Sequence, residues 1–225
     1  MSNYQQAAPP PVIPRLSPQI RAGLAGIRDA EGTTGPKAYS TAFTGVQFDN
    51  SLPHQGIVRG SRNGYRSDAA GAYQFKKSTW DGQGGGAMTP ARQDWYATKL
   101  WLARVGLPRN QHGVNELTRL LVKNNGISSG MSHKMAPEWA SFPTHAGVSY
   151  YGQPVKSLSR INKTYHSSLP GYQQEDKVMT AIESPTGIAD LYKGTNKPSG
   201  PKEINMLNIL NKETQGAWKS LLIGK

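Results

Sequence analysis

Cysteine is absent from the 225-residue chain, which excludes disulfide bonds and thiolate zinc sites. Long apolar runs are absent too, and the mean hydropathy is −0.59, so we expect no transmembrane segment. The N-terminus, "MSNYQQAAPPPVIP", lacks the basic start and apolar stretch of a signal peptide. These features predict a protein made in the cytoplasm that needs a separate route to any site of action outside it.

Acidic residues are scarce: 14 acidic residues face 26 lysines and arginines, giving a net charge of +12. This excess predicts attraction to a polyanion, which could be a nucleic acid, an anionic lipid surface or an acidic cell-wall polymer. The basic residues are scattered and form no block or arm. We therefore expect no specific nucleic-acid recognition, and a DNA-binding role rests on the charge alone.

Metal-ligand patterns are also missing. The five histidines are scattered, and no two have the spacing of a helical metal site: His54, His112, His133, His145 and His166. We expect no metal and no cofactor.

The local composition of the chain predicts three parts. Residues 1–16 form a proline-rich extended arm, and 17–170 form the main domain. Residues 171–225 are an irregular extension whose end, 203–225, is predicted as an amphipathic helix. That helix could dock on its own domain or on a partner chain, or it could be membrane-active.

Within the main domain, apolar spacing and capping residues predict mostly helices. The expected helices cover 17–31, 75 to about 80, 89–105, 113–124 and 154–166, with a helical turn over 134–140. Short strands or hairpins are expected in "YSTAFTGVQF" (39–48) and "AAGAYQF" (69–75).

Glu31, in "IRDAEGTTG", stands out among the acids. The spacing of Ile20, Leu24 and Ile27 brings it onto the apolar face of the first helix, immediately before the helix-ending Gly32. Partial burial and the nearby helix carbonyls would raise its pKa. A carboxyl group kept protonated is what a glycosidic oxygen needs as a general acid. The alternative is a structural or merely exposed carboxylate.

Two further segments combine aromatic rings with amides. "GAYQF" contains Gly71, Tyr73 and Gln74, and "VSYYGQP" contains Tyr150, Tyr151 and Gln153. Rings that stack on sugars and amides that bond their hydroxyls suit a carbohydrate cleft. The alternative for each tyrosine is an ordinary core position.

Five blocks in order, "IRDAEGT", "YSTAFTGVQF", "SDAAGAYQFKKSTWD", "PEWASFP" and "YYGQPVKSL", resemble the lambda-phage-type lysozymes, which are peptidoglycan lytic transglycosylases. The resemblance covers about 17–166. It implies an α+β, lysozyme-like domain, mostly helical, with a small β-hairpin or sheet lobe that lines the cleft. It also implies cleavage of the β-1,4 bond between N-acetylmuramic acid and N-acetylglucosamine. Segment 122–137 departs from the pattern and is predicted as a loop.

The same resemblance implies that the catalytic glutamate is Glu31. It implies a substrate cleft at Tyr39, at the block containing Gly71, Tyr73 and Gln74, and at the block Tyr151–Gly152–Gln153.

The number of carboxylates separates two mechanisms. A hydrolase generally needs a second one, and Asp49 and Asp68 are the candidates, although turn or cap chemistry explains both. A lytic transglycosylase needs only Glu31, which protonates the leaving oxygen and then accepts the proton of the muramic acid 6-hydroxyl. This route forms a 1,6-anhydro product and is the mechanism we favour.

The biological setting has alternatives as well. The chain could be a released endolysin or a lysin packaged in the phage particle, with its terminal segments bound to other virion proteins. In either case it would act on periplasmic peptidoglycan. A different class of function is a non-enzymatic structural or wall-binding protein on a lysozyme scaffold.

Overall fold

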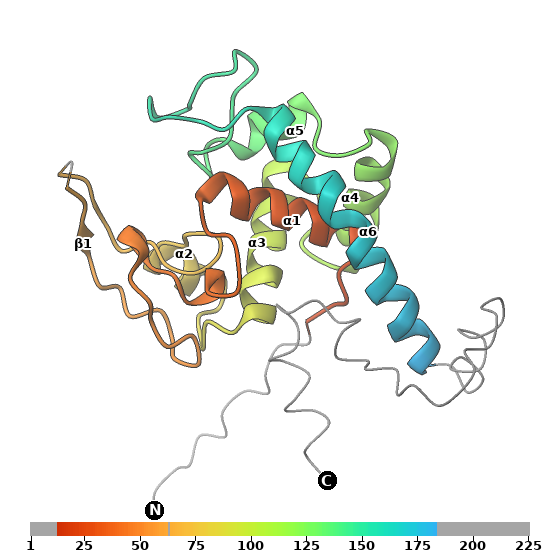
Figure 1. The fold of residues 1–225 in the computed structure, drawn as a ribbon, viewed down its shortest axis with the longest axis horizontal. Helices are drawn as coiled ribbons and strands as arrows, with labels where there is room; N and C mark the ends of the chain where they lie inside the picture. The colour runs from red at the N-terminus through yellow and green to blue at the C-terminus, as the bar shows by residue number, and fades with distance from the viewer. Residues whose placement is uncertain (1–12, 63, 184–225) are drawn as a thin grey trace, which may run out of the picture.

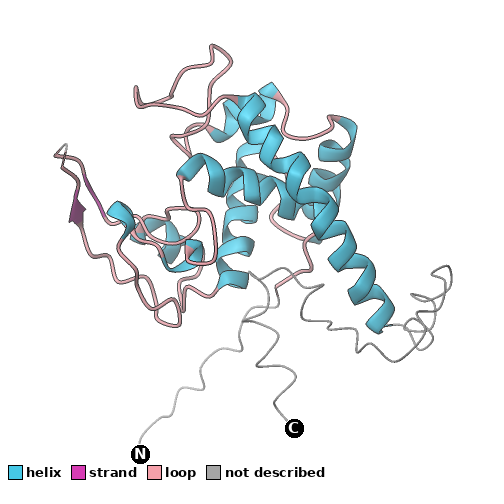
Figure 2. Cartoon of the chain, in the orientation of Figure 1, coloured by secondary structure: helices cyan, strands magenta, loops and turns pink. Residues whose placement is uncertain are grey.

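The computed structural model describes residues 13–62 and 64–183 (Figure 1). In chain order the elements are α1 (Pro18–Glu31), the 3₁₀ turns η1 (Ala38–Ser40) and η2 (Phe43–Gly45), β1 (Arg59–Gly60), β2 (Arg66–Ser67), α2 (Lys77–Gly82), α3 (Pro90–Val105), α4 (Gln111–Lys123), α5 (Ser129–Met135) and α6 (Leu158–Glu183). The described part is therefore a helical body with a small lobe that contains a two-stranded antiparallel sheet (Figure 2). This confirms the expected α+β class.

The first helix forms as its capping residues predict. The side chain of Ser17 accepts a hydrogen bond from the backbone nitrogen of Ile20, and Gly32 ends the helix in the left-handed conformation at φ 72°. Helix α1 runs through the centre of the body and packs along α6 (Figure 1). Gly23 permits this central position, because a side chain there would collide with the ring of Trp101.

Helix α3 lies where it was expected, from Pro90 to a left-handed Gly106. The side chain of Thr89 makes no cap hydrogen bond, so Pro90 at the first turn is the stronger start signal. The core that α3 shares with α1 contains large, fully buried side chains: Ile20, Leu24, Ile27, Trp80, Trp101 and Leu102.

The segments expected to hold short strands form only isolated bridges. Residues 39–48 contain η2, most of η1 and an antiparallel bridge between Thr41 and Gln47, and 69–75 contribute further bridges, such as Ala70 with Phe75. The strands are β1 and β2, with Arg59 opposite Ser67. Glycine and small residues in 39–48 favour turns, and Thr44 adopts a left-handed φ of 70° that no strand accepts.

Segment 122–137 is not the predicted loop. Helix α4 extends into it, and α5 occupies its centre, starting after Ser128, whose side chain accepts from the nitrogen of Met131. The helical turn predicted over 134–140 therefore overlaps only the last residues of α5, which ends at Met135. Ser128 is an N-cap residue that could have predicted the start of α5, but the glycine and serine residues around it favoured a loop prediction.

The helix expected over 154–166 begins later and is longer than predicted. Helix α6 continues through Pro170 to Glu183, although proline removes one helix hydrogen bond. Its second half is held by the core, where Tyr172 is 8% and Val178 is 5% exposed. Tyr172 continues the inward-facing stripe begun by Ile161 and Tyr165.

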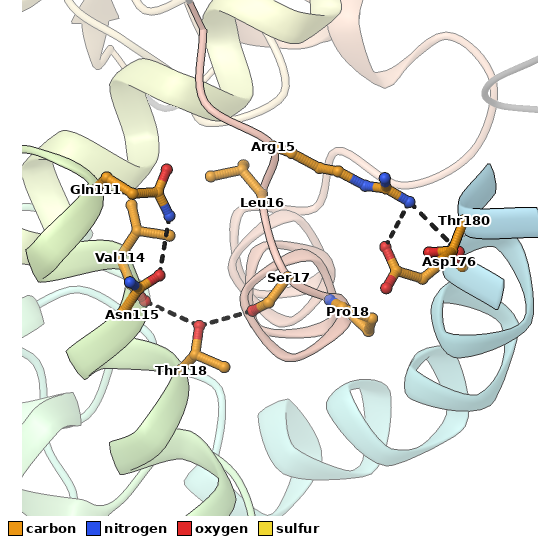
Figure 3. A pocket seen from close by; sticks show the side chains of 10 residues that line it. All are labelled: Arg15, Leu16, Ser17, Pro18, Gln111, Val114, Asn115, Thr118, Asp176 and Thr180. Carbon is orange, nitrogen blue, oxygen red and sulfur yellow. Dashed lines mark hydrogen bonds and ion pairs between the residues drawn. The ribbon is translucent and has the colours of Figure 1, made fainter. Parts of the chain in front are cut away.

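The end of the proline-rich arm belongs to the body rather than extending from it. Leu16 is buried, and Ile13 packs against the core. Arg15 pairs with Asp176 of α6 at 3.0 Å, beside a groove of about 440 Å³ between α1, α4 and α6 (Figure 3). Residues 1–12 and 184–225, including the helix expected over 203–225, lie outside the described residues.

Candidate active site

Glu31 lies at the C-terminal end of α1, where its side chain is partly buried. The hydroxyl of Ser141 donates a hydrogen bond of 2.5 Å to Oε1 of Glu31. Burial raises the pKa of Glu31, and the hydrogen bonds from Ser141 offset only part of that rise. The carboxyl group therefore favours the protonated form more than an exposed glutamate does.

The chain after Glu31 is anchored to the β lobe. Thr33 donates through its hydroxyl to the carbonyl of Ala72 at 2.5 Å, and its nitrogen bonds the carbonyl of Arg28 at 2.9 Å. These bonds fix the end of α1 against the lobe. The helix end and the lobe are thereby held in one position relative to each other.

A cleft of about 450 Å³ lies between the lobe, α3 and the loop after α5. Its lining residues are Tyr73, Gln74, Phe75, Lys76, Thr79, Leu100, Arg104, Pro137, Glu138, Trp139, Ala140, Tyr151 and Gln153. Ala140 precedes Ser141, the partner of Glu31. The cleft thus reaches the residue next to the one that holds the candidate acid.

Several predicted substrate-binding residues are where a ligand could reach them. Gln74, Tyr151 and Gln153 line the cleft from opposite sides. Tyr151 is 58% exposed and donates its hydroxyl to the carbonyl of Pro137 at 2.8 Å. Tyr150 does not line the cleft, but its ring meets that of Tyr151 edge-on at 5.0 Å.

Other predicted contacts have structural roles. Tyr73 forms part of the cleft floor but is 2% exposed, so its ring offers no face for a sugar. Gly71 occupies a turn at φ 80°, where a side chain would collide with Gln93. Tyr39 is partly buried and lies outside the cleft lining. Their predicted roles as sugar contacts stay predictions.

Tyr39 and Tyr73 belong to a polar cluster around Asp94. Both hydroxyls donate to Oδ1 of Asp94, at 2.8 and 2.5 Å. The buried guanidinium of Arg28 donates to the same two hydroxyls and to that of Tyr172. Burial raises the pKa of Asp94, and the charge of Arg28 and the two hydroxyls oppose that rise.

The two candidate second carboxylates are engaged in local structure. Asp49 is exposed and accepts from the nitrogen and hydroxyl of Ser51, which lower its pKa. Partial burial works to raise the pKa of Asp68, but bonds from the nitrogen of Lys77 and from Lys76 outweigh it and lower the pKa. Neither aspartate lines the cleft.

Two residues of the candidate site were missed by sequence reasoning. Glu138 lines the cleft and is held by Arg104 at 2.8 Å. Ser141 bonds Glu31 from a segment 110 positions away in the chain. Their shared block "PEWASFP" was the available signal, but it does not reveal which of its side chains turns toward Glu31.

Over residues 13–62 and 64–183, no helix is long and apolar enough to cross a membrane. Within the same residues, no three histidine or acidic side chains are grouped so that they could hold a metal ion.

Comparison with known proteins identifies the family. The model of the Endolysin family matches residues 21–172. The chain belongs to this family. It is a lysozyme-like enzyme of phage type that degrades peptidoglycan. The match ends at 172, so the second half of α6 and residues 13–20 lie outside the family region.

A solved structure shows the same fold. The structure of bacteriophage lambda lysozyme complexed with a chitohexasaccharide is similar at a TM-score of 0.54 and 20% identity, covering 69% of this chain and 96% of that chain. A second structure, the lysozyme from bacteriophage lambda, has a TM-score of 0.48 and 19% identity, covering 71% and 95% of the two chains. No curated protein matches the chain.

Proposed function

We propose that this enzyme is a lytic transglycosylase. It cleaves the bond between N-acetylmuramic acid and N-acetylglucosamine with Glu31 as both acid and base. The observation that carries the proposal is the partly buried Glu31, with its raised pKa, beside a cleft that neither Asp49 nor Asp68 lines. The lambda lysozyme structure with a bound chitohexasaccharide supports a glycan as the ligand of this cleft.

In the first step, the protonated carboxyl group of Glu31 donates its proton to the glycosidic oxygen as the bond from that oxygen to C1 of the muramic acid breaks. The raised pKa keeps the proton available for this transfer. The resulting carboxylate receives the hydrogen bond of Ser141. Ser141 thereby stabilises the charged form of Glu31 between the two steps.

In the second step, the carboxylate of Glu31 takes the proton of the muramic acid 6-hydroxyl while that oxygen bonds C1. The product is a 1,6-anhydro ring, and Glu31 is protonated again for the next cycle. No water is consumed, so no second carboxylate is required to activate one. Gln74, Tyr151 and Gln153 would hold the sugars through hydrogen bonds and ring contact.

Mass spectrometry of the products of sacculus digestion tests the mechanism. We expect anhydro-muramic ends from the intact enzyme and far less product from Glu31→Gln in the same time. Glu138→Gln is the control, since it alters another cleft carboxylate without touching the proposed acid. Reducing muramic acid ends would establish a hydrolase, and would direct attention to Glu138, Asp49 and Asp68. A fully active Glu31→Gln would refute the site, and an inactive intact enzyme would favour a purely wall-binding role.

We further propose that the enzyme acts on periplasmic peptidoglycan from within the phage particle, with residues 1–12 and 184–225 bound to other virion proteins. Both segments lie outside the family match and adjoin one end of the body, where Arg15 pairs with Glu183 at 2.9 Å. Mass spectrometry of purified particles is expected to detect the chain. Its absence from particles, with accumulation in late-infected cells, would indicate a released endolysin.

A further inference from the structure

The hairpin of residues 57–67 concentrates positive charge. It carries Arg59, Arg62 and Arg66, and residues 50–67 contain no acidic residue. None of the three arginines pairs with an acid within 13–62 and 64–183. The guanidinium of Arg59 bonds one backbone carbonyl, that of Ile57, at 3.0 Å. The hairpin therefore presents donors suited to carboxylates.

The same hairpin exposes apolar side chains. Ile57, Val58 and Tyr65 are 48%, 52% and 72% exposed. The hairpin projects from the outer side of the lobe, away from α6 (Figure 1). Exposed aliphatic groups and a ring beside unpaired arginines indicate a binding surface rather than a solvated turn.

The base of the hairpin is connected to the cleft wall. Strand β2 ends at Ser67, and the next residue, Asp68, pairs with Lys76 at 3.2 Å and accepts from the nitrogen of Lys77. Lys76 lines the cleft. The hairpin is thus attached to the wall along which a glycan strand would lie, and it extends outward from that wall.

We propose that this hairpin binds the anionic peptide stems of peptidoglycan, an inference that rests on the proposed function. Each muramic acid carries a short peptide with several carboxylates and alanine methyl groups. A stem of five residues spans at most about 17 Å, so its carboxylates can lie well outside the cleft that holds the sugars. Arg59, Arg62 and Arg66 bind the carboxylates, while Ile57, Val58 and Tyr65 contact the methyl groups.

The test compares two glycans: purified strands with their stems, and strands from which an amidase has removed the stems. We expect a KM about fivefold lower on peptide-bearing strands at low salt, and the difference shrinks at high salt. The triple variant Arg59→Gln, Arg62→Gln and Arg66→Gln brings the ratio of the two KM values close to one. Arg62→Glu, at the exposed turn, provides a second variant that leaves both strands of the hairpin intact.

The control removes the same charge elsewhere: Lys123→Gln, Lys134→Gln and Lys163→Gln, all exposed, should retain the preference for stems. A triple arginine variant with an unchanged preference would overturn the proposal. So would an intact enzyme that does not distinguish the two strands, or arginine-dependent binding to phosphatidylglycerol vesicles in its place. Failure of the proposed function is recognised separately, because Glu31→Gln would then remain active on strands without stems.

Discussion

Glu31 and Asp94 are two carboxyl groups whose pKa burial raises, and they have opposite surroundings. Asp94 accepts from the hydroxyls of Tyr39 and Tyr73 and lies in the field of buried Arg28. Glu31 accepts from one side chain, that of Ser141, which follows the cleft-lining Ala140 in the chain. The comparison shows that burial alone does not mark a reactive acid. Glu31, which has fewer partners and whose partner Ser141 adjoins the cleft lining, is the carboxyl group that we propose transfers a proton.

The largest expected effect comes from Glu31→Gln. The amide keeps the size of the side chain but carries no transferable proton, so kcat should fall about 10³-fold. Turbidity loss of a sacculus suspension measures the rate. The fold should persist, because the amide can still accept the hydrogen bond of Ser141. A residual rate close to that of the intact enzyme would remove Glu31 from the mechanism.

The same variant should change how stability depends on pH. Because burial raises the pKa of Glu31, the folded protein binds more protons than the unfolded chain between the two carboxyl pKa values. Stability contributed by the protonated group is therefore lost as pH rises through that interval. Urea unfolding across acidic and neutral pH should show Glu31→Gln gaining stability relative to the intact enzyme as pH rises. A relative loss would contradict the direction of the shift.

Asp94→Ala should have its main effect on folding. It removes the acceptor of two tyrosine hydroxyls and leaves the charge of Arg28 without its acidic partner in the cluster. The free energy of unfolding should fall by about 3 kcal/mol. Urea denaturation measures it, with Asp49→Ala as the control for an exposed aspartate, expected within about 0.5 kcal/mol of the intact protein. Equal effects of the two substitutions would show that the cluster is not structural.

Local signals predicted one part of this site and could not predict another. The cap at Ser17, the apolar stripe and Gly32 locate Glu31 correctly. The two aromatic–amide blocks read alike in sequence, yet Tyr73 is 2% and Tyr151 58% exposed. That difference depends on Asp94, which lies 21 positions after Tyr73. Long-range partners of this kind are not encoded in a local pattern.

The helices also divide into those that local signals predict and those that depend on distant contacts. Helix α3 was predictable because its proline and glycine signals are local. The continuation of α6 past Pro170 depends on tertiary contacts of Tyr172 and Val178, which outweigh the local penalty of proline. The sites of β1 and β2 were missed because each strand has only two residues, too few for an alternating pattern.

The two tyrosines themselves provide a matched test of smaller size. Tyr73→Phe removes one of the two hydroxyls on Asp94 and should cost about 1.5 kcal/mol of unfolding free energy with little change in KM. Tyr151→Phe removes a hydroxyl from an exposed ring and should cost less than about 0.5 kcal/mol. Tyr151→Ala, which removes the ring, should raise KM on glycan. If Tyr73→Phe raised KM as much, the cleft floor would be a sugar contact after all.

Ser141→Ala has the smallest expected effect and the most specific one. The hydroxyl of Ser141 donates to the carboxylate, so it lowers the pKa of Glu31 against the rise caused by burial. Without it the pKa should rise further. Since the acid step requires protonated Glu31, the alkaline limb of kcat/KM against pH should move to higher pH. Loss of about 1 kcal/mol in stabilising the carboxylate between the steps should also lower kcat about fivefold.

Thr144→Val is the control for Ser141→Ala, because it removes a hydroxyl of the same loop that donates to Val148 and should leave the alkaline limb in place. If both substitutions only loosened the loop, kcat would fall in both variants and the alkaline limb of kcat/KM against pH would stay in place in each. A shift of the Ser141→Ala limb to lower pH would mean that the serine stabilises the protonated acid instead. The hydroxyl of Ser141 would then accept from protonated Glu31, and the carboxylate that acts as base in the second step would lack this hydrogen bond.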